Sequence, residues 1–249
     1  MKASTWDLRI ARAEKLACAH PAAADVLKFY AEITRFQKKV YDALACVKRS
    51  DLHTTLLIPH FAPLLSLVRS IGPQELARVA DELEGCENAL QDLLIDPDPS
   101  PSIYSFFGRA LLQPYMENLA RRSDVVVGNC PRTCPFCGEK PQAGVLREEG
   151  DGGKRSLICS LCATEWEFRR LLCPGCGEEA VDKLCVYTAS EFDYVRVEAC
   201  ESCHTYIKSI DLTKNGLAVP VVDELATIPL TVWAEENGYR KLQLNLLSM

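Results

Sequence analysis

The sequence predicts an α+β fold, in which a helical N-terminal domain precedes two small metal-binding units and a C-terminal helix. Three observations lead to this prediction. Apolar residues recur at spacings of three and four through residues 1–125, which is typical of helices with one buried face. From residue 130 the pattern changes to short runs rich in valine, isoleucine, tyrosine and threonine, which favour strands. The same segment contains four Cys-x-x-Cys pairs, a spacing typical of metal sites.

Composition limits the class of protein. Of the 249 residues, 48% are hydrophobic and 25% are charged, which is sufficient for a buried core and typical of soluble proteins. We find no apolar run long enough for a membrane span, and charges interrupt the N-terminal stretch where a secretion signal would be apolar. We therefore expect a cytoplasmic protein. The net charge of −6 argues against a nucleic-acid partner, because phosphate contacts need clustered basic residues.

The first domain is expected to be helical throughout. Ser4 or Thr5 can cap the first helix, which ends near His20 because proline follows. Gly72 and Pro73 separate two later helices, since proline is favoured at the first helical position. The expected helices cover residues 5–20, 21–48, 59–70, 73–94 and 103–122.

The cysteine-rich segment should form strands, and the tail should return to helix. A glycine-rich stretch at residues 148–153 indicates a hairpin between the first two strands. The expected strands cover residues 143–148, 154–159, 183–188, 194–199 and 205–212. Residues 221–237 favour a helix, although Pro229 lies inside it, where proline can break a helix in two. We expect this helix to pack on the metal-binding segment or on the N-terminal helices.

Two halves of the cysteine-rich segment repeat each other. The sequence CPFCGEKP at 134–141 resembles CPGCGEEA at 173–180, and each is followed by a second pair, CSLC at 159–162 and CESC at 200–203. The offsets of 39 and 41 residues indicate that a small unit has been duplicated. The predicted domains are therefore 1–128, 129–171, 172–216 and 217–249.

Each half can bind one metal ion. Two cysteines separated by two residues can hold an ion from a tight turn, and Gly138 and Gly177 permit a positive φ directly after two of the pairs. A facing pair across a hairpin completes a site of four thiolates, as in zinc ribbons and rubredoxin. The expected ligands are Cys134, Cys137, Cys159 and Cys162 for one ion, and Cys173, Cys176, Cys200 and Cys203 for the other.

Alternatives remain for the pairing, the metal and the chemistry. Joining 159/162 with 173/176 leaves only ten intervening residues and leaves the outer pairs unused. A catalytic disulfide would open a helix of a βαβ unit, a pattern that the sequence lacks. Four thiolates suit both zinc and iron, so we expect two iron or two zinc ions. The remaining cysteines are scattered, and Cys18, Cys46 and Cys86 are expected to be small buried side chains on helices.

The order of the motifs CPFCG, CSLCATEW, CPGCG and CESCHTYIKSIDL resembles the FdhE family, the formate dehydrogenase accessory proteins. The N-terminal RIARAEKLACAHPAAADVLKFYAEITRFQ and the tail DELATIPLTVWAEENGYRKLQLNLL are similar to that family as well. The resemblance implies a cytoplasmic protein with a helical N-terminal region and two rubredoxin-like metal sites. It also implies a role in assembling active formate dehydrogenase through contact with the catalytic subunit of that enzyme.

We expect no enzymatic activity, because the sequence shows no phosphate loop, nucleophile elbow or paired-carboxylate site. Two other functions stay open, a zinc-ribbon module that binds nucleic acid and a rubredoxin-like electron-transfer protein. Aromatic and basic residues after the second pair of each half either contact a partner or pack around the metal sites. These residues are Trp166, Phe168, Arg169, Arg170, Tyr206 and Lys208.

Overall fold

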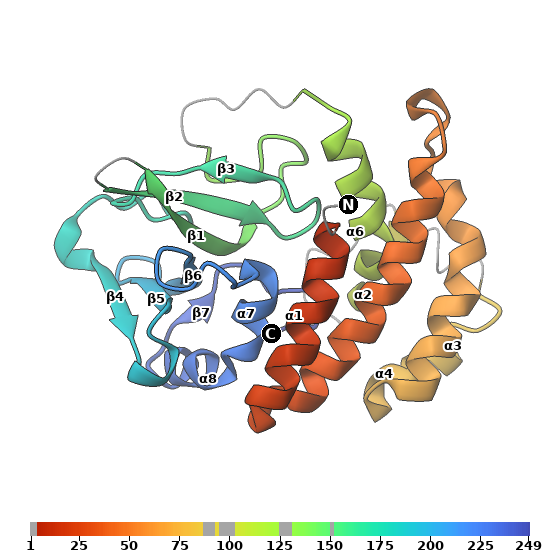
Figure 1. Ribbon diagram of the computed structural model, residues 1–249, viewed down its shortest axis with the longest axis horizontal. Helices are drawn as coiled ribbons and strands as arrows, with labels where there is room; N and C mark the ends of the chain where they lie inside the picture. The colour runs from red at the N-terminus through yellow and green to blue at the C-terminus, as the bar shows by residue number, and fades with distance from the viewer. Residues whose placement is uncertain (1–3, 87–92, 95–102, 125–130, 150–151) are drawn as a thin grey trace.

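The computed structural model describes residues 4–86, 93–94, 103–124, 131–149 and 152–249 (Figure 1). Helices from the first half of the chain form one side of the molecule, and a sheet from the second half forms the other. The C-terminal helices lie beside the sheet and reach the first N-terminal helix. The α+β fold predicted from the sequence is confirmed.

The N-terminal side consists of five described helices. They are α1 (Thr5–Ala19), α2 (Ala24–Ala45), α3 (Phe61–Ile71), α4 (Gln74–Glu82) and α6 (Ser105–Arg121). Ser4 caps α1 as expected, because its side chain accepts a hydrogen bond from the Asp7 amide while the Asp7 carboxylate accepts one from the Ser4 amide. A short 3₁₀ turn at Pro21–Ala23 separates α1 from α2, in agreement with the predicted break.

The helix expected to run from 73 to 94 ends early. Helix α4 stops at Glu82, and the chain turns through Gly85, whose φ of 78° no helix accommodates. Residues 87–92 of the expected helix lie outside the described residues. Helix α3 begins at Phe61 rather than 59, because a 3₁₀ segment, Thr54–His60, precedes it.

Helices α2, α3 and α6 enclose the larger core. Ile33, Val40, Leu64, Phe107 and Leu111 are completely buried there. Each such side chain contributes about 1.5–3 kcal/mol of burial free energy, so these helices associate through their apolar faces. The same core extends to the first cysteine-rich unit, which fixes that unit against the helices.

The sheet has seven strands in the order β3-β2-β1-β6-β5-β4, with β7 paired to β6. The strands are β1 (Pro141–Glu149), β2 (Gly152–Cys159), β3 (Glu165–Glu167), β4 (Leu184–Thr188), β5 (Val195–Cys200), β6 (Thr205–Asp211) and β7 (Arg240–Lys241). The five predicted strands are confirmed, with ends that differ by one or two residues. The sequence did not indicate β3 or β7, because segments of three and two residues show no periodicity.

The duplication seen in the sequence is visible in the strand pairing. Strands β1, β2 and β3 form one antiparallel unit, and β4, β5 and β6 form a second unit with the same order. Parallel pairing of β1 with β6, from Ala143↔Lys208 to Leu146↔Asp211, joins the two units. Gly144 lies opposite Ser209 at this junction, where any larger side chain would collide with the Ser209 hydroxyl. The domain boundaries themselves stay a prediction.

The C-terminal segment packs both on the N-terminal helices and on the sheet of the cysteine-rich segment, the two alternatives that the sequence allowed. It forms α7 (Pro220–Ala226) and α8 (Ile228–Glu236), so Pro229 does divide the expected helix. Arg12 of α1 donates hydrogen bonds to the buried Asp223 of α7, and α7 also contacts β1 and β6. The tail therefore holds the helical side and the sheet together.

One described segment, Thr54–Ile71, has the length and mean hydropathy (1.3) of a membrane-spanning helix. It consists of the 3₁₀ segment followed by α3, and α3 buries Phe61, Leu64, Leu65 and Val68 in the helical core. It is not a clear membrane span.

Candidate metal centre

The first cysteine pair of each unit forms a tight turn. In the first unit the Gly138 amide donates to the Cys134 carbonyl at 2.9 Å, and Gly138 has a φ of 81°. In the second unit the Gly177 amide donates to the Cys173 carbonyl at 3.0 Å, and Gly177 has a φ of 84°. The positive φ predicted at both glycines is confirmed, and it is a conformation that few other residues adopt.

The second pair of each unit begins where a strand ends. Cys159 is the last residue of β2, and Cys200 is the last residue of β5. The residue after each of these pairs also has a positive φ, 54° at Ala163 and 53° at His204. Sequence reasoning did not find these two positions because neither residue is glycine.

The turns bring the eight predicted cysteines together in two clusters of four. In each cluster the sulfur atoms all lie within 4.8 Å of one another. In the first, Cys137 Sγ lies 3.4 Å from Cys159 Sγ and 3.6 Å from Cys162 Sγ. In the second, the Sγ atoms of Cys173 and Cys203 are 3.7 Å apart, as are those of Cys176 and Cys200. The structure thus pairs the cysteines within each half of the repeat, and not 159/162 with 173/176.

These distances fit a tetrahedral ion. Four thiolates at about 2.3 Å from one metal lie roughly 3.8 Å from one another, close to the separations in both clusters. A disulfide would bring two sulfurs to about 2.05 Å, and all eight are free cysteines. Each cluster could therefore hold a metal ion.

Hydrogen bonds to sulfur surround both clusters. The Phe136 amide lies 3.4 Å from Cys134 Sγ, and the Gly175 amide lies 3.3 Å from Cys173 Sγ, at equivalent places in the repeat. A side chain at position 175 would approach within 2.8 Å of the Thr205 hydroxyl, which accounts for glycine there. Donors of this kind compensate the negative charge that four thiolates concentrate.

Two threonine hydroxyls also lie within hydrogen-bond distance of cysteine sulfurs. Thr164 Oγ1 lies 3.1 Å from Cys162 Sγ, and Thr205 Oγ1 lies 3.0 Å from Cys203 Sγ. Sequence reasoning missed both, although each stands two residues after the last cysteine of its unit, in CATEW and CHTYI. Burial raises the pKa of Cys203, but the hydroxyl and amide of Thr205 and the neighbouring thiols lower it, to about 7. Burial raises the pKa values of the other three cysteines of this cluster, so Cys203 is the thiol that its surroundings favour most as a thiolate.

The two clusters differ in their surroundings. In the first, Cys134, Cys159 and Cys162 are buried and belong to the core that includes the N-terminal helices. In the second, Cys176 is exposed and Cys203 is half-buried. An ion in the second cluster would thus lie nearer to solvent and to any partner.

The aromatic and basic residues after the second pairs are mostly interior. Trp166 and Phe168 are 2% exposed, and Tyr206 and Lys208 are 1% exposed, so these four pack around the sites instead of facing a partner. Only Arg169 and Arg170 of the predicted set are exposed.

Cys18, Cys46 and Cys86 are exposed, so the expectation that they are buried was wrong. Cys18 lies near the end of α1, and Cys46 directly follows α2, where helix ends leave side chains in solvent. Cys86 follows the turn at Gly85 instead of lying within a continuous helix.

Comparison with known proteins identifies the family. Residues 133–170 match the family model described as FdhE, central domain, and residues 173–248 match the model described as FdhE, C-terminal domain. A relative from Aquifex aeolicus named Protein FdhE homolog is 31% identical, over 81% of this chain and 73% of its own length. One of the same name from Stutzerimonas stutzeri is 31% identical, over 96% of this chain and 88% of its own.

A solved structure agrees over the full length. The crystal structure of the FdhE protein from Pseudomonas aeruginosa matches with a TM-score of 0.78 and 26% sequence identity, covering 100% of this chain and 98% of that one. The arrangement of helical side and sheet is therefore a fold that a known protein shares. The resemblance found in the sequence motifs is confirmed, and the chain belongs to the FdhE family.

Proposed function

We propose that the protein is a cytoplasmic, non-enzymatic accessory protein that binds the catalytic subunit of formate dehydrogenase and is needed for assembly of the active enzyme. Membership of the FdhE family carries this proposal. The proposed partners include no nucleic acid, in keeping with the net charge of −6.

We further propose that the eight clustered cysteines bind two metal ions, iron or zinc. The sulfur separations of 3.4–3.7 Å and the hydrogen bonds to sulfur support this assignment. Bound ions would stabilise units whose strands are short, and structural zinc contributes on the order of 10 kcal/mol in comparable sites. Iron in the same sites would add one-electron redox chemistry, which zinc lacks.

A second candidate function is electron transfer of the rubredoxin kind. The observation that favours it is the exposure of Cys176 in the second cluster, because electron transfer needs a centre near the surface. It is compatible with the accessory role, since a protein that contacts a metalloenzyme subunit could also exchange an electron with it. A reversible ferric signal in electron paramagnetic resonance would support it, and zinc alone in protein from the native host would contradict it.

Capture of the client tests the main proposal. The tagged full-length chain is incubated with an extract of the native host, and the formate dehydrogenase catalytic subunit is identified by mass spectrometry. We expect specific capture, together with loss of formate dehydrogenase activity in a strain that lacks this chain. No capture combined with normal activity in the deletion strain would contradict the proposal.

A further inference from the structure

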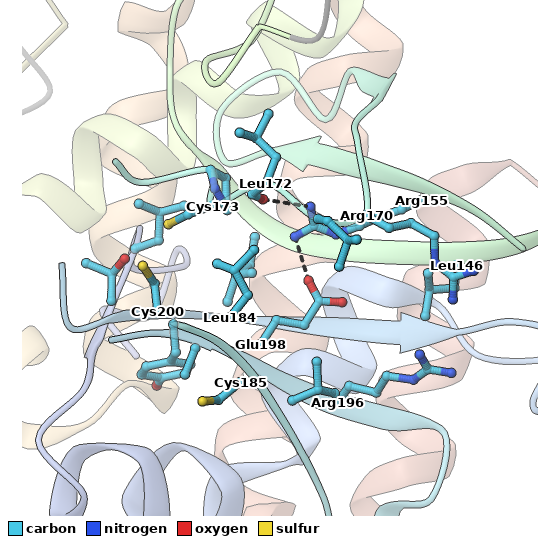
Figure 2. Close-up of a pocket in the computed structure, with 18 residues that line it drawn as sticks. Leu146, Arg155, Arg170, Leu172, Cys173, Leu184, Cys185, Arg196, Glu198 and Cys200 are labelled. Atoms are coloured by element: carbon cyan, nitrogen blue, oxygen red, sulfur yellow. Dashed lines mark hydrogen bonds and ion pairs between the residues drawn. The ribbon is translucent and has the colours of Figure 1, made fainter. Parts of the chain in front are cut away.

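A cavity of about 430 Å³ lies on the face of the sheet opposite the C-terminal helices (Figure 2). Side chains of a strand alternate between the two faces of a sheet. Val195 and Val197 of β5 pack in one cluster with α8, whereas Arg196 and Glu198 line the cavity. The linker Arg170–Pro174, which joins the two cysteine units, forms another part of the lining.

The walls of the cavity are mainly apolar and partly open to solvent. Leu146, Leu172 and Leu184 line it together with Ile207. Two further lining residues are unusually exposed for apolar side chains, Leu171 at 52% and Val186 at 57%. Scattered exposed leucines and valines are normal, but a cavity that is rimmed by them and has charged groups inside is typical of a binding site.

Three guanidinium groups line this cavity against one carboxylate. Arg155 is 3% exposed and donates to Glu198 Oε2 at 2.5 Å and to the Arg169 carbonyl at 2.9 Å, while its Nε has no partner among the described residues. Figure 2 shows these arginines away from the end where Cys173 and Cys200 lie. The cavity is thus locally positive in a chain of net charge −6.

One of the arginines, Arg170, has no charged partner among the described residues, and a second, Arg196, is paired but partly exposed. Arg196 Nη2 lies 2.6 Å from Asp211 Oδ2, and the Arg196 side chain is still 27% exposed. Arg170 is exposed and forms no hydrogen bond or ion pair with any residue that the structure describes. Since the Glu198 carboxylate is already paired with Arg155, a carboxylate from outside would find complementary charge here.

At the neighbouring edge of the sheet, the described part of the chain supplies no further strand. Strand β4 supplies Leu184, Cys185 and Val186 to the lining and pairs only with β5 among the described strands. Its sequence, LCVYT, contains no charge and no proline, the residues that usually protect an edge strand from pairing. An extended segment could add to such an edge by backbone hydrogen bonds.

We propose that the cavity and the outer edge of β4 bind an extended acidic segment of a partner protein. A carboxylate side chain of that segment pairs with Arg170 and Arg196, and a neighbouring apolar side chain contacts Leu184 and Val186. This inference deepens the proposed function by naming the surface and the chemistry of the segment, and it rests on that function only for the identity of the partner.

A defined peptide tests the site without formate dehydrogenase. The probe is a nine-residue fluorescein-labelled peptide of alternating glutamate and valine, and fluorescence anisotropy reports its binding to the full-length protein. The same peptide with lysine in place of glutamate controls for charge. Arg170→Glu is the test variant, and Arg169→Glu is the matched control, because Arg169 is exposed, pairs with Glu179 and does not line the cavity. Circular dichroism of both variants verifies folding.

We expect saturable binding of the glutamate peptide and no binding of the lysine peptide. The Kd of the glutamate peptide should increase by about tenfold or more in Arg170→Glu and should change by less than about twofold in Arg169→Glu. Absence of saturable binding, or equal effects of the two variants, would overturn the proposal. Self-association of the wild-type chain that Val186→Asp abolishes, without peptide binding, would assign the edge to a second copy and would also overturn it. None of these outcomes depends on whether the dehydrogenase subunit is captured.

Discussion

The hydroxyl of Thr205 lies 3.0 Å from the sulfur of Cys203, and the repeat places an equivalent threonine at the first cluster. Replacing Thr205 with valine keeps the shape of the side chain and removes this hydrogen bond. The affinity of the second site for its ion should fall by about 10–100-fold, the usual effect of removing a group that hydrogen-bonds to a metal ligand. Competition with a chromophoric chelator measures the affinity.

Two variants control this result. Thr205→Ser keeps the hydroxyl and should bind the second ion almost as tightly as the wild type, and Thr164→Val should weaken the first ion instead. Equal affinities in Thr205→Val and wild type would show that the hydroxyl does not support the site.

The two ions should leave in a fixed order. Cys176 is exposed, whereas three cysteines of the first cluster are buried in the core shared with the helices. A chelator should therefore remove one equivalent rapidly and the second slowly, and Cys176→Ser should abolish the rapid phase. Release of both equivalents in a single phase would contradict the difference in accessibility.

The first cluster should matter more for global stability. Cys159 is completely buried and belongs to the same core as Phe107 and Leu64. Cys159→Ser should prevent binding of the first ion. The free energy of metal binding, on the order of 10 kcal/mol for structural zinc, would then no longer stabilise the fold, so much of the chain should unfold. Thermal unfolding followed by circular dichroism checks this, with Cys176→Ser expected to lower the midpoint less. The half-buried thiol Cys185, outside both clusters, gives a matched serine control.

A buried lysine should give the stability a characteristic dependence on pH. Lys208 donates to Thr231 Oγ1 at 2.8 Å and lies 3.1 Å from a Glu224 carboxylate oxygen, and burial lowers the pKa of Lys208 to about 8. Its ordinary pKa is 10.5, so between pH 8 and 10.5 the unfolded chain binds more protons than the native one. This group therefore adds stability as the pH rises through that window.

The variant Lys208→Met lacks this titration. The free energy of unfolding of the wild type, relative to Lys208→Met, should increase by up to about 3 kcal/mol between pH 8 and 10.5. Urea unfolding at several pH values measures it. A difference that stays constant over this range would mean that Lys208 keeps its ordinary pKa in the folded protein.

Much of the architecture follows from local patterns in the sequence. The capped start of α1, the division of the tail at Pro229 and the positive φ at Gly138 are determined by neighbouring residues, and all three were predicted. The cysteine clusters were also predictable, because the repeat fixes which pairs lie across a hairpin.

The remaining features depend on contacts between distant residues. Parallel pairing of β1 with β6 joins the two units. The only local sign of this pairing is Gly144, which permits the close approach to Ser209. Trp166 and Lys208 were candidates for a partner surface, yet packing by α7 and the N-terminal core buries them. The cavity around Arg155 is formed by five strands and a linker, an arrangement that no local pattern encodes.

Metal analysis combined with X-ray absorption tests the central claim most directly, that eight cysteines bind two ions in two separate sites. Protein purified gently from the native host should contain two equivalents of iron or zinc per chain, each surrounded by four sulfur atoms at about 2.3 Å. Fewer than two equivalents after reconstitution, a first shell of nitrogen or oxygen, or disulfide bonds among the eight cysteines would contradict it.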